Sequence, residues 1–221
     1  MFPISDVIPS RTTPFVTIGL IALNALAFLY ELRLSDAELD HLARTAGVVP
    51  AAFAPVDVLS SMFLHGGWLH FLGNMLYLWI FGDNVEDRFG HLRFLIFYLA
   101  CGAAAAATQV FVNPASTVPM IGASGAIAGV MGAYFVLFPQ SRVLAAVFIL
   151  FIIDVIEIPA IFFLGIWFVM QLFSGVGSLV ETAEGGVAFF AHVGGFAAGA
   201  LAGGFARMHA RSRRDYWHGA L

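Results

Sequence analysis

Residues 119–129 read PMIGASGAIAG, and this uncharged stretch leads into the apolar run on which the fold depends. The run Ser124–Phe138 has fifteen residues and ends before Pro139, so as a helix it would measure about 22 Å. The hydrocarbon core of a bilayer is about 30 Å thick. If the helix reaches the inner surface of a membrane, Ser124 lies roughly 8 Å below the outer surface. By itself, Ser124 is either a small packing residue or a nucleophile.

The composition indicates an integral membrane protein. Of the 221 residues, 60% are hydrophobic and only 11% are charged, whereas soluble domains carry about 25% charged residues. The net charge is −4 and every cation is an arginine, so the chain lacks the basic footprint of a nucleic-acid-binding protein. The single cysteine, Cys101, has no partner in the chain for a disulfide, and its apolar surroundings favour simple packing.

Six segments are candidates for membrane-spanning helices, which need about 20 apolar residues each. They are Phe15–Leu32, Trp68–Gly82, Phe94–Phe111, Ser124–Phe138, Pro159–Leu179 and Phe189–Ala206. The predicted fold is therefore all-α: a short cytoplasmic N-terminus (1–14), a six-helix membrane domain (15–206) and a cationic cytoplasmic tail (207–221). We expect 33–64 to be a long loop with short amphipathic helices, and Val143–Ile153, too short to span, to be a loop or interfacial segment.

The distribution of arginine predicts the orientation. With six spans, one side would hold Arg11, Arg88, Arg93, Arg142, Arg207, Arg211, Arg213 and Arg214. The other side would hold only Arg33 and Arg44, so both termini are expected in the cytoplasm. The cluster formed by Asp83, Glu86, Asp87 and Arg88 is interpreted as a solvated, ion-paired helix end.

Polar residues gather at one depth in this topology. The second, fourth and sixth helices run in the same direction, and each begins near the outer face. His70 and Asn74 lie four residues apart on one face of the second helix. Ser124 begins the fourth helix, and His192 lies in the first turn of the sixth. Because polar groups inside a membrane are costly, their convergence predicts a functional site.

Glycine spacing predicts that the fourth and sixth helices pack closely. Gly125 and Gly129 form one GxxxG pattern, and Gly195, Gly199 and Gly203 form two more in succession. Small residues at this spacing let helix backbones approach each other in lipid. The resulting contact would bring Ser124 within reach of His192.

Three motifs, in this order, give the chain a resemblance to a known family. They are HGGWLHFLGNMLYLWIFGDNVEDRFG, GASGAIAG and AHVGGFAAG, within residues 56–206. This set resembles the rhomboid intramembrane serine proteases of the bacterial type. The resemblance implies that Ser124 is the nucleophile and His192 its general base, and that His70 and Asn74 stabilise the oxyanion. It also implies a structural role for His65 and a location in the bacterial inner membrane. The glycines Gly122, Gly125, Gly195 and Gly199 are expected to support the structure.

The chain departs from the family pattern at two points. Many members have an aromatic residue four positions after the serine, where this chain has Ala128, and many have a Trp-Arg pair in the first loop, which is missing here. No acidic residue is placed to complete a triad, since Glu181 and Glu184 belong to the outer loop. We therefore predict a Ser–His dyad in which packing orients the imidazole ring.

The predicted function is that of an intramembrane serine endopeptidase acting on single-span membrane proteins near the outer face. The alternative is a non-catalytic relative that binds transmembrane helices, and a transporter or channel would need a polar path across the membrane. Residues 180–188, with Phe189 and Phe190, are a candidate lid. We expect no cofactor and no metal site, because His65, His70 and His192 lack acidic or cysteine ligands at a suitable spacing. Membrane lipid is the expected surrounding; the substrate and the oligomeric state stay open.

Overall fold

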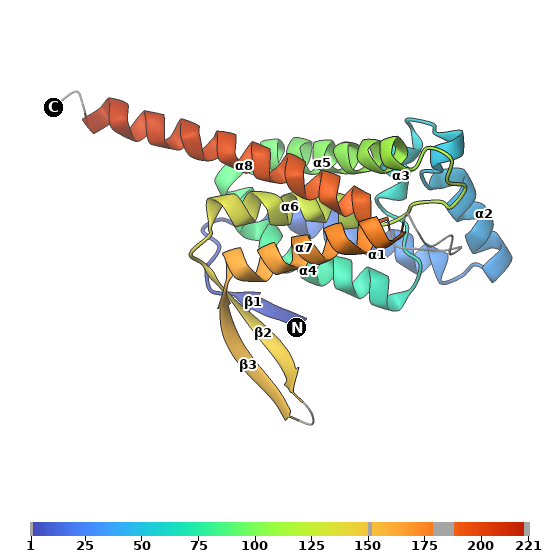
Figure 1. Ribbon diagram of the computed structural model, residues 1–221, viewed down its shortest axis with the longest axis horizontal. Coiled ribbons are helices and arrows are strands. Elements are labelled where there is room, and N and C mark those ends of the chain that lie inside the picture. The colour runs from blue at the N-terminus through green and yellow to red at the C-terminus, as the bar shows by residue number, and fades with distance from the viewer. Residues whose placement is uncertain (1, 150–151, 179–187, 219–221) are drawn as a thin grey trace.

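The computed structural model describes residues 2–149, 152–178 and 188–218, and it is mainly helical. The long helices run side by side, with short helices at one end of the molecule and a small β-sheet near the other (Figure 1). Helix α1 comprises Phe15–Glu31, α4 Trp68–Phe89, α5 His91–Val112, α6 Ser124–Leu137, α7 Ala160–Ser178 and α8 Phe189–His218. Each of the six candidate membrane-spanning segments thus corresponds to one of these helices.

Three of these helices are long and apolar enough to cross a membrane: His91–Val112, Ala160–Gly177 and Phe189–His209. Helices α1 and α6 are apolar but shorter, and α4 carries charged residues in its last two turns. The number of helices that cross the bilayer is therefore still a prediction. Helix α8 continues to His218, so the expected boundary at residue 207 does not coincide with a helix end.

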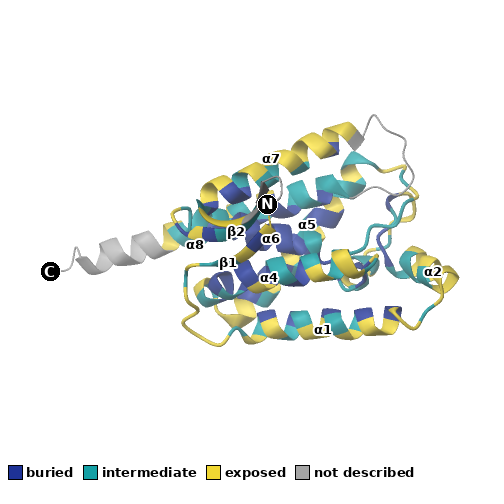
Figure 2. Cartoon of the chain, turned by 90° about the horizontal axis from the view of Figure 1, so that it is seen from below, coloured by how far each residue is buried: buried dark blue, intermediate teal, exposed yellow. Residues whose placement is uncertain are grey.

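Helix α6 occupies the centre of the bundle. Every residue from Ala126 to Tyr134 is buried, and Figure 2 shows this helix in dark blue between its neighbours. It packs against α4, α5, α7 and α8. A short apolar helix rich in glycine and alanine suits this position, because its small side chains leave room for four neighbours.

Helices α6 and α8 approach each other through glycine. A Cβ atom added at Gly199 would lie 1.8 Å from the carbonyl oxygen of Gly129, and one added at Gly195 would lie 2.0 Å from that of Gly125. Both distances are far below any real van der Waals contact, so no larger residue fits at either position. This packing sets the separation between the N-terminal ends of the two helices, where the polar residues lie.

Glu86 fastens the N-terminus of α1 to α4. Its carboxylate accepts hydrogen bonds from the backbone N–H groups of Val16 and Thr17 at 2.9 and 2.8 Å, and from the Thr17 hydroxyl at 2.7 Å. Glu86 is fully buried, so the expectation of a solvated helix end is wrong for this residue. A carboxylate is favoured here because the unpaired N–H groups and the dipole of α1 are positive at its start.

The expectation of an all-α fold is corrected by a three-stranded antiparallel sheet. Strands β1 (Phe2–Asp6), β2 (Arg142–Ile149) and β3 (Ile152–Pro159) lie in the order β1-β2-β3. The segment expected to be a loop or interfacial segment thus lies largely in two antiparallel strands, with Val143 opposite Ile158. Its many β-branched residues favour an extended backbone, and the N-terminal segment adds the third strand.

Tyr134 joins the sheet to the end of α6. Its hydroxyl donates to the Asp6 carboxylate at 2.6 Å and lies 2.8 Å from the Ser141 hydroxyl. Burial raises the pKa of Asp6 to about 6, although the hydrogen bond from Tyr134 acts in the opposite direction. The sheet is therefore attached to the most buried helix of the bundle.

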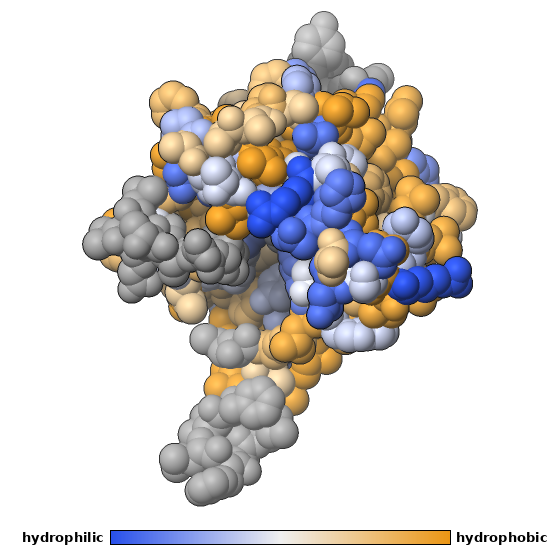
Figure 3. Space-filling view, turned by 90° about the vertical axis from the view of Figure 1, so that its right-hand side faces the viewer, coloured by the Kyte–Doolittle hydropathy of each residue, from blue (hydrophilic) through white to orange (hydrophobic). Residues whose placement is uncertain are grey.

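The opposite end of the molecule carries α2 (Asp36–Ala46), η1 (Pro50–Ala52) and α3 (Asp57–Ser61), in agreement with the short helices expected between residues 33 and 64. Seen from this end, hydrophilic residues gather near the middle of a largely hydrophobic outline (Figure 3). This distribution suits a surface that faces water while the flanks face lipid.

Candidate active site

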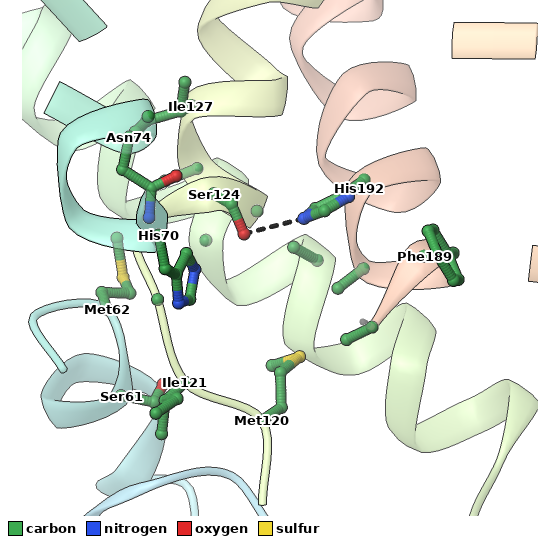
Figure 4. Close-up of a pocket in the computed structure, with 18 of the residues that line it drawn as sticks. Ser61, Met62, His70, Asn74, Met120, Ile121, Ser124, Ile127, Phe189 and His192 are labelled. Atoms are coloured by element: carbon green, nitrogen blue, oxygen red, sulfur yellow. Dashed lines mark hydrogen bonds between the residues drawn. The ribbon is translucent and has the colours of Figure 1, made fainter. Parts of the chain in front are cut away.

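Ser124 and His192 are in direct contact at the ends of two helices. The Ser124 Oγ atom lies 2.7 Å from Nε2 of His192. Ser124 is the first residue of α6, and His192 lies in the first turn of α8. Figure 4 shows Ser124 between His192 on one side and His70 and Asn74 on the other. The four polar residues expected at one depth are thus gathered in one place.

The segment before Ser124 is irregular but well bonded. Met120 and Val48 exchange two backbone hydrogen bonds of 2.8 and 3.0 Å, and the Gly122 N–H donates to the Ser61 carbonyl at 2.8 Å. Gly122 has a φ of +120°, a conformation that disfavours side-chain-bearing residues. The backbone therefore turns sharply just before α6 and exposes the N-terminus of that helix to the cavity.

His70 and Asn74 present polar atoms to the space beside Gly122. A Cβ added at Gly122 would lie 2.6 Å from Nε2 of His70 and 3.6 Å from Nδ2 of Asn74. The Gly66 N–H donates to Nδ1 of His70 at 3.3 Å, so in the neutral ring the proton is on Nε2. Nδ2 of Asn74 is buried and has no hydrogen-bond partner among the described residues. The N–H groups of His70 Nε2 and Asn74 Nδ2 thus lie beside the space that the missing side chain of Gly122 leaves open.

Helix α7 supplies the contacts on the far side of His192. Nδ1 of His192 lies 2.7 Å from Oε1 of Gln171, and the ring centroids of His192 and Trp167 are 5.9 Å apart. Sequence reasoning missed both residues, since it expected packing alone to orient the ring. Gln171 could have been found, because it is the one amide side chain in a mainly apolar helix.

His65 lies beside the cavity and holds the chain between α3 and α4. Its backbone N–H donates to the buried carboxylate of Glu31 at 3.1 Å, and its Nδ1 lies 3.2 Å from the carbonyl oxygen of Phe63. Burial, more than the neighbouring His70, lowers the pKa of His65 to about 4. His65 is not among the residues that line the cavity around Ser124.

The cavity around Ser124 has a volume of about 910 Å³. Its walls come from α4, α5, α6, α7, α8 and the segment before α6, and Phe189 is one of the lining residues. The rest of the proposed lid, residues 180–187, lies outside the described part of the chain, as do Glu181 and Glu184. Within the described ranges, no three His, Cys, Asp or Glu side chains are grouped as a metal site.

The fold and site are those of a membrane protein in which a serine and a histidine are in hydrogen-bond contact at the N-terminal ends of two apolar helices. The rhomboid domain model matches residues 52–209, which is more than half of the sequence. The chain therefore belongs to the rhomboid family.

Individual relatives agree with this assignment. The chain is 35% identical to RHOMBOID-like protein 4 of Arabidopsis thaliana over 146 residues, which are 66% of this chain and 32% of the relative. It is 41% identical to rhomboid protease GluP of Bacillus subtilis over 76 residues, 34% of this chain and 14% of the relative. It is 31% identical to the mitochondrial rhomboid protein 1 of Saccharomyces cerevisiae over 97 residues, 42% and 28% of the two chains. The chain thus spans a third or less of the length of these relatives.

Proposed function

We propose that this protein is an intramembrane serine endopeptidase in which Ser124 is the nucleophile and His192 the general base. The observation that carries the proposal is the 2.7 Å contact between Ser124 Oγ and His192 Nε2 within a large cavity. Membership of a family that includes a named protease, GluP, supports it. A serine hydroxyl is a weak nucleophile until a base removes its proton, and the contact with His192 supports this role for the imidazole.

The reaction follows from this arrangement. As Ser124 Oγ attacks the carbonyl carbon of the scissile bond, its proton passes to Nε2 of His192. The imidazolium then gives that proton to the leaving amine, and an acyl-enzyme is left on Ser124. In the second half of the reaction His192 takes a proton from a water molecule, which attacks the ester carbon. His192 then returns the proton to Ser124 Oγ as the ester bond breaks and the new C-terminal carboxylic acid leaves.

The negative oxygen of the tetrahedral intermediate needs donors that are already in place. Asn74 Nδ2 and His70 Nε2 are directed to the space beside Gly122. The backbone N–H of Ser124, at the N-terminus of α6, adds a third donor and the positive end of a helix dipole. We assign the stabilisation of the oxyanion to these three groups.

The proposed substrates are single-span membrane proteins cleaved near the outer face. The cavity lies at the same end of the bundle as α2 and α3, and the arginine distribution supports an outer position for this end. A peptide bond within an intact helix has its carbonyl hydrogen-bonded, so the substrate must unwind before attack, and glycine or proline lowers the cost of unwinding. Cytoplasmic termini and a bacterial inner membrane belong to the same proposal.

The test uses purified protein in liposomes with a model transmembrane substrate and a fluorophosphonate probe that labels activated serines. We expect the wild type to cleave and to be labelled, and Ser124→Ala and His192→Ala to do neither while they melt as the wild type does. Cleavage by Ser124→Ala at the wild-type rate would disprove the assignment of the nucleophile. A wild type that binds the substrate but neither cuts it nor reacts with the probe would favour a non-catalytic helix-binding protein.

A further inference from the structure

His192 is held at both ring nitrogens, and the partner on the second nitrogen comes from α7. Ser124 Oγ lies 2.7 Å from Nε2, and Gln171 Oε1 lies 2.7 Å from Nδ1. We propose that Gln171 is a positioning residue that selects the tautomer of His192 needed for general-base catalysis and stabilises the imidazolium formed during the reaction. This inference rests on the proposed function and adds a third member to the predicted pair.

The tautomer follows from what each atom is able to donate. A neutral imidazole carries one N–H and one lone pair, and the carbonyl oxygen of an amide only accepts. With Gln171 Oε1 on Nδ1, the ring proton lies on Nδ1, so the lone pair of Nε2 faces the Ser124 hydroxyl. When Nε2 takes the proton of Ser124, both nitrogens become donors, and Gln171 continues to accept from Nδ1. The position matches that of the acid in a Ser-His-Asp triad, but without its charge.

No other described side chain is placed to do this. Among the residues that line the cavity, the titratable side chains are His70 and Tyr77 from α4 and His192 itself, and none is a carboxylate. Helix α5 contributes only Gly102 and Ala105 to the lining. Among the described residues, His192 therefore has no acidic neighbour in the cavity, and the acceptor on Nδ1 is neutral.

Trp167 is a second residue of α7 whose side chain lies against His192. It lies four residues before Gln171, on the same face of the helix. Its ring is 5.9 Å from the His192 ring and tilted by 36°. At the position where many family members have an aromatic residue, α6 has the buried Ala128. The aromatic neighbour and the hydrogen-bond acceptor of His192 thus both come from α7.

Two substitutions of Gln171 test the proposal. Gln171→Leu keeps the approximate size and removes the acceptor, whereas Gln171→Glu keeps an acceptor and adds a charge. Ser174→Ala is the matched control, because Ser174 is an exposed polar residue less than one turn further along α7. For each variant, kcat and KM for a transmembrane substrate in liposomes are measured as a function of pH, together with the rate of fluorophosphonate labelling and the melting temperature.

We expect Gln171→Leu to lower kcat by about 10- to 100-fold, the range for losing a hydrogen bond to a charged group, with KM nearly unchanged. The acid limb of its kcat/KM profile should move to lower pH, because the imidazolium loses its acceptor. Gln171→Glu should keep most of the plateau activity and move the acid limb to higher pH, since a carboxylate favours the imidazolium. Ser174→Ala should match the wild type.

Opposite shifts of the acid limb are the decisive result, because a merely structural role would not produce them. The proposal is wrong if both Gln171 variants keep the wild-type kcat and acid limb. It is also wrong if both lose activity and labelling equally and melt at a lower temperature, since Gln171 would then be structural. A wild type that is neither active nor labelled would instead contradict the proposed function, so the two failures are distinguishable.

Discussion

Ser124 and His192 are 68 residues apart in the chain, yet their side chains meet at hydrogen-bond distance. Ser124 is the first residue of α6 and His192 lies in the first turn of α8, and both side chains line the cavity. The neighbouring donors differ in how they are held. His70 receives a hydrogen bond from Gly66, whereas the Nδ2 atom of Asn74 is buried without a partner among the described residues. A buried unpaired donor costs stability, and an oxyanion would satisfy it.

The role of Asn74 as an oxyanion donor can be tested by substitution. Asn74→Ala should lower kcat by about 10²-fold, the lower end for an oxyanion donor, because His70 and the Ser124 N–H remain. Asn74→Asp, which has the same shape, should be worse, since its carboxylate repels the oxyanion. The measurement is kcat for a transmembrane substrate, with melting curves as the control. Unchanged kcat with a clearly lowered melting temperature would show that Asn74 holds helices together instead.

At the scale of elements, the contact between α6 and α8 controls the site. The two backbones touch through Gly129 and Gly199, where an added Cβ would overlap the opposing carbonyl. Both helices begin at the cavity, so a change in their separation further along acts directly on the distance between Ser124 and His192. Packing and chemistry are therefore coupled through the same pair of helices.

Gly199→Val should consequently reduce both stability and activity. A branched side chain at this position must push α8 away from α6, which lengthens the hydrogen bond from Ser124 to His192. Gly204→Val is the matched control, because a Cβ at Gly204 on the same helix meets nothing within 4 Å. Thermal melting and substrate cleavage check the pair. Wild-type behaviour of Gly199→Val in both assays would contradict the close-packing argument.

In the molecule as a whole, a titratable side chain of the sheet contacts the helical bundle. The Asp6 carboxylate accepts from Tyr134, a residue of the buried central helix. Burial raises the pKa of Asp6 from 3.8 to about 6, so the folded protein binds this proton more tightly than the unfolded chain does. The stability that protonated Asp6 contributes is complete below pH 3.8 and is lost as the pH rises through about 6.

Asp6→Asn, which imitates the protonated side chain, should remove this dependence. Relative to the variant, the wild type should melt at a progressively lower temperature as the pH is raised from 4 towards 6 and slightly beyond. Comparing the two proteins at each pH cancels the contributions of titrating groups other than those that interact with Asp6, as Asp83 does. If the difference in melting temperature between the two proteins stayed constant across this pH interval, the pKa of Asp6 would be the same in the folded and unfolded states.

Much of the helical framework was predictable, because it depends on local properties of the chain. Helices α4, α6 and α8 begin at Trp68, Ser124 and Phe189, the residues expected from the sequence. The apolar runs, the glycine spacing and the positions of the polar residues are all visible without a structure. The three motifs were also sufficient to recognise the family, which the domain match to residues 52–209 confirms.

Only the tertiary structure showed which helix lies against the far side of His192 and which strands pair in the sheet. Gln171 contacts His192 because α7 presents that face to α8. The sequence of α7 shows Gln171 as a polar residue but does not show how the helix is rotated against α8. The sheet was missed for a similar reason, since β1 pairs Phe2 with Ala146 across most of the chain. A short run of β-branched residues indicates an extended strand only when a partner strand is known to lie beside it.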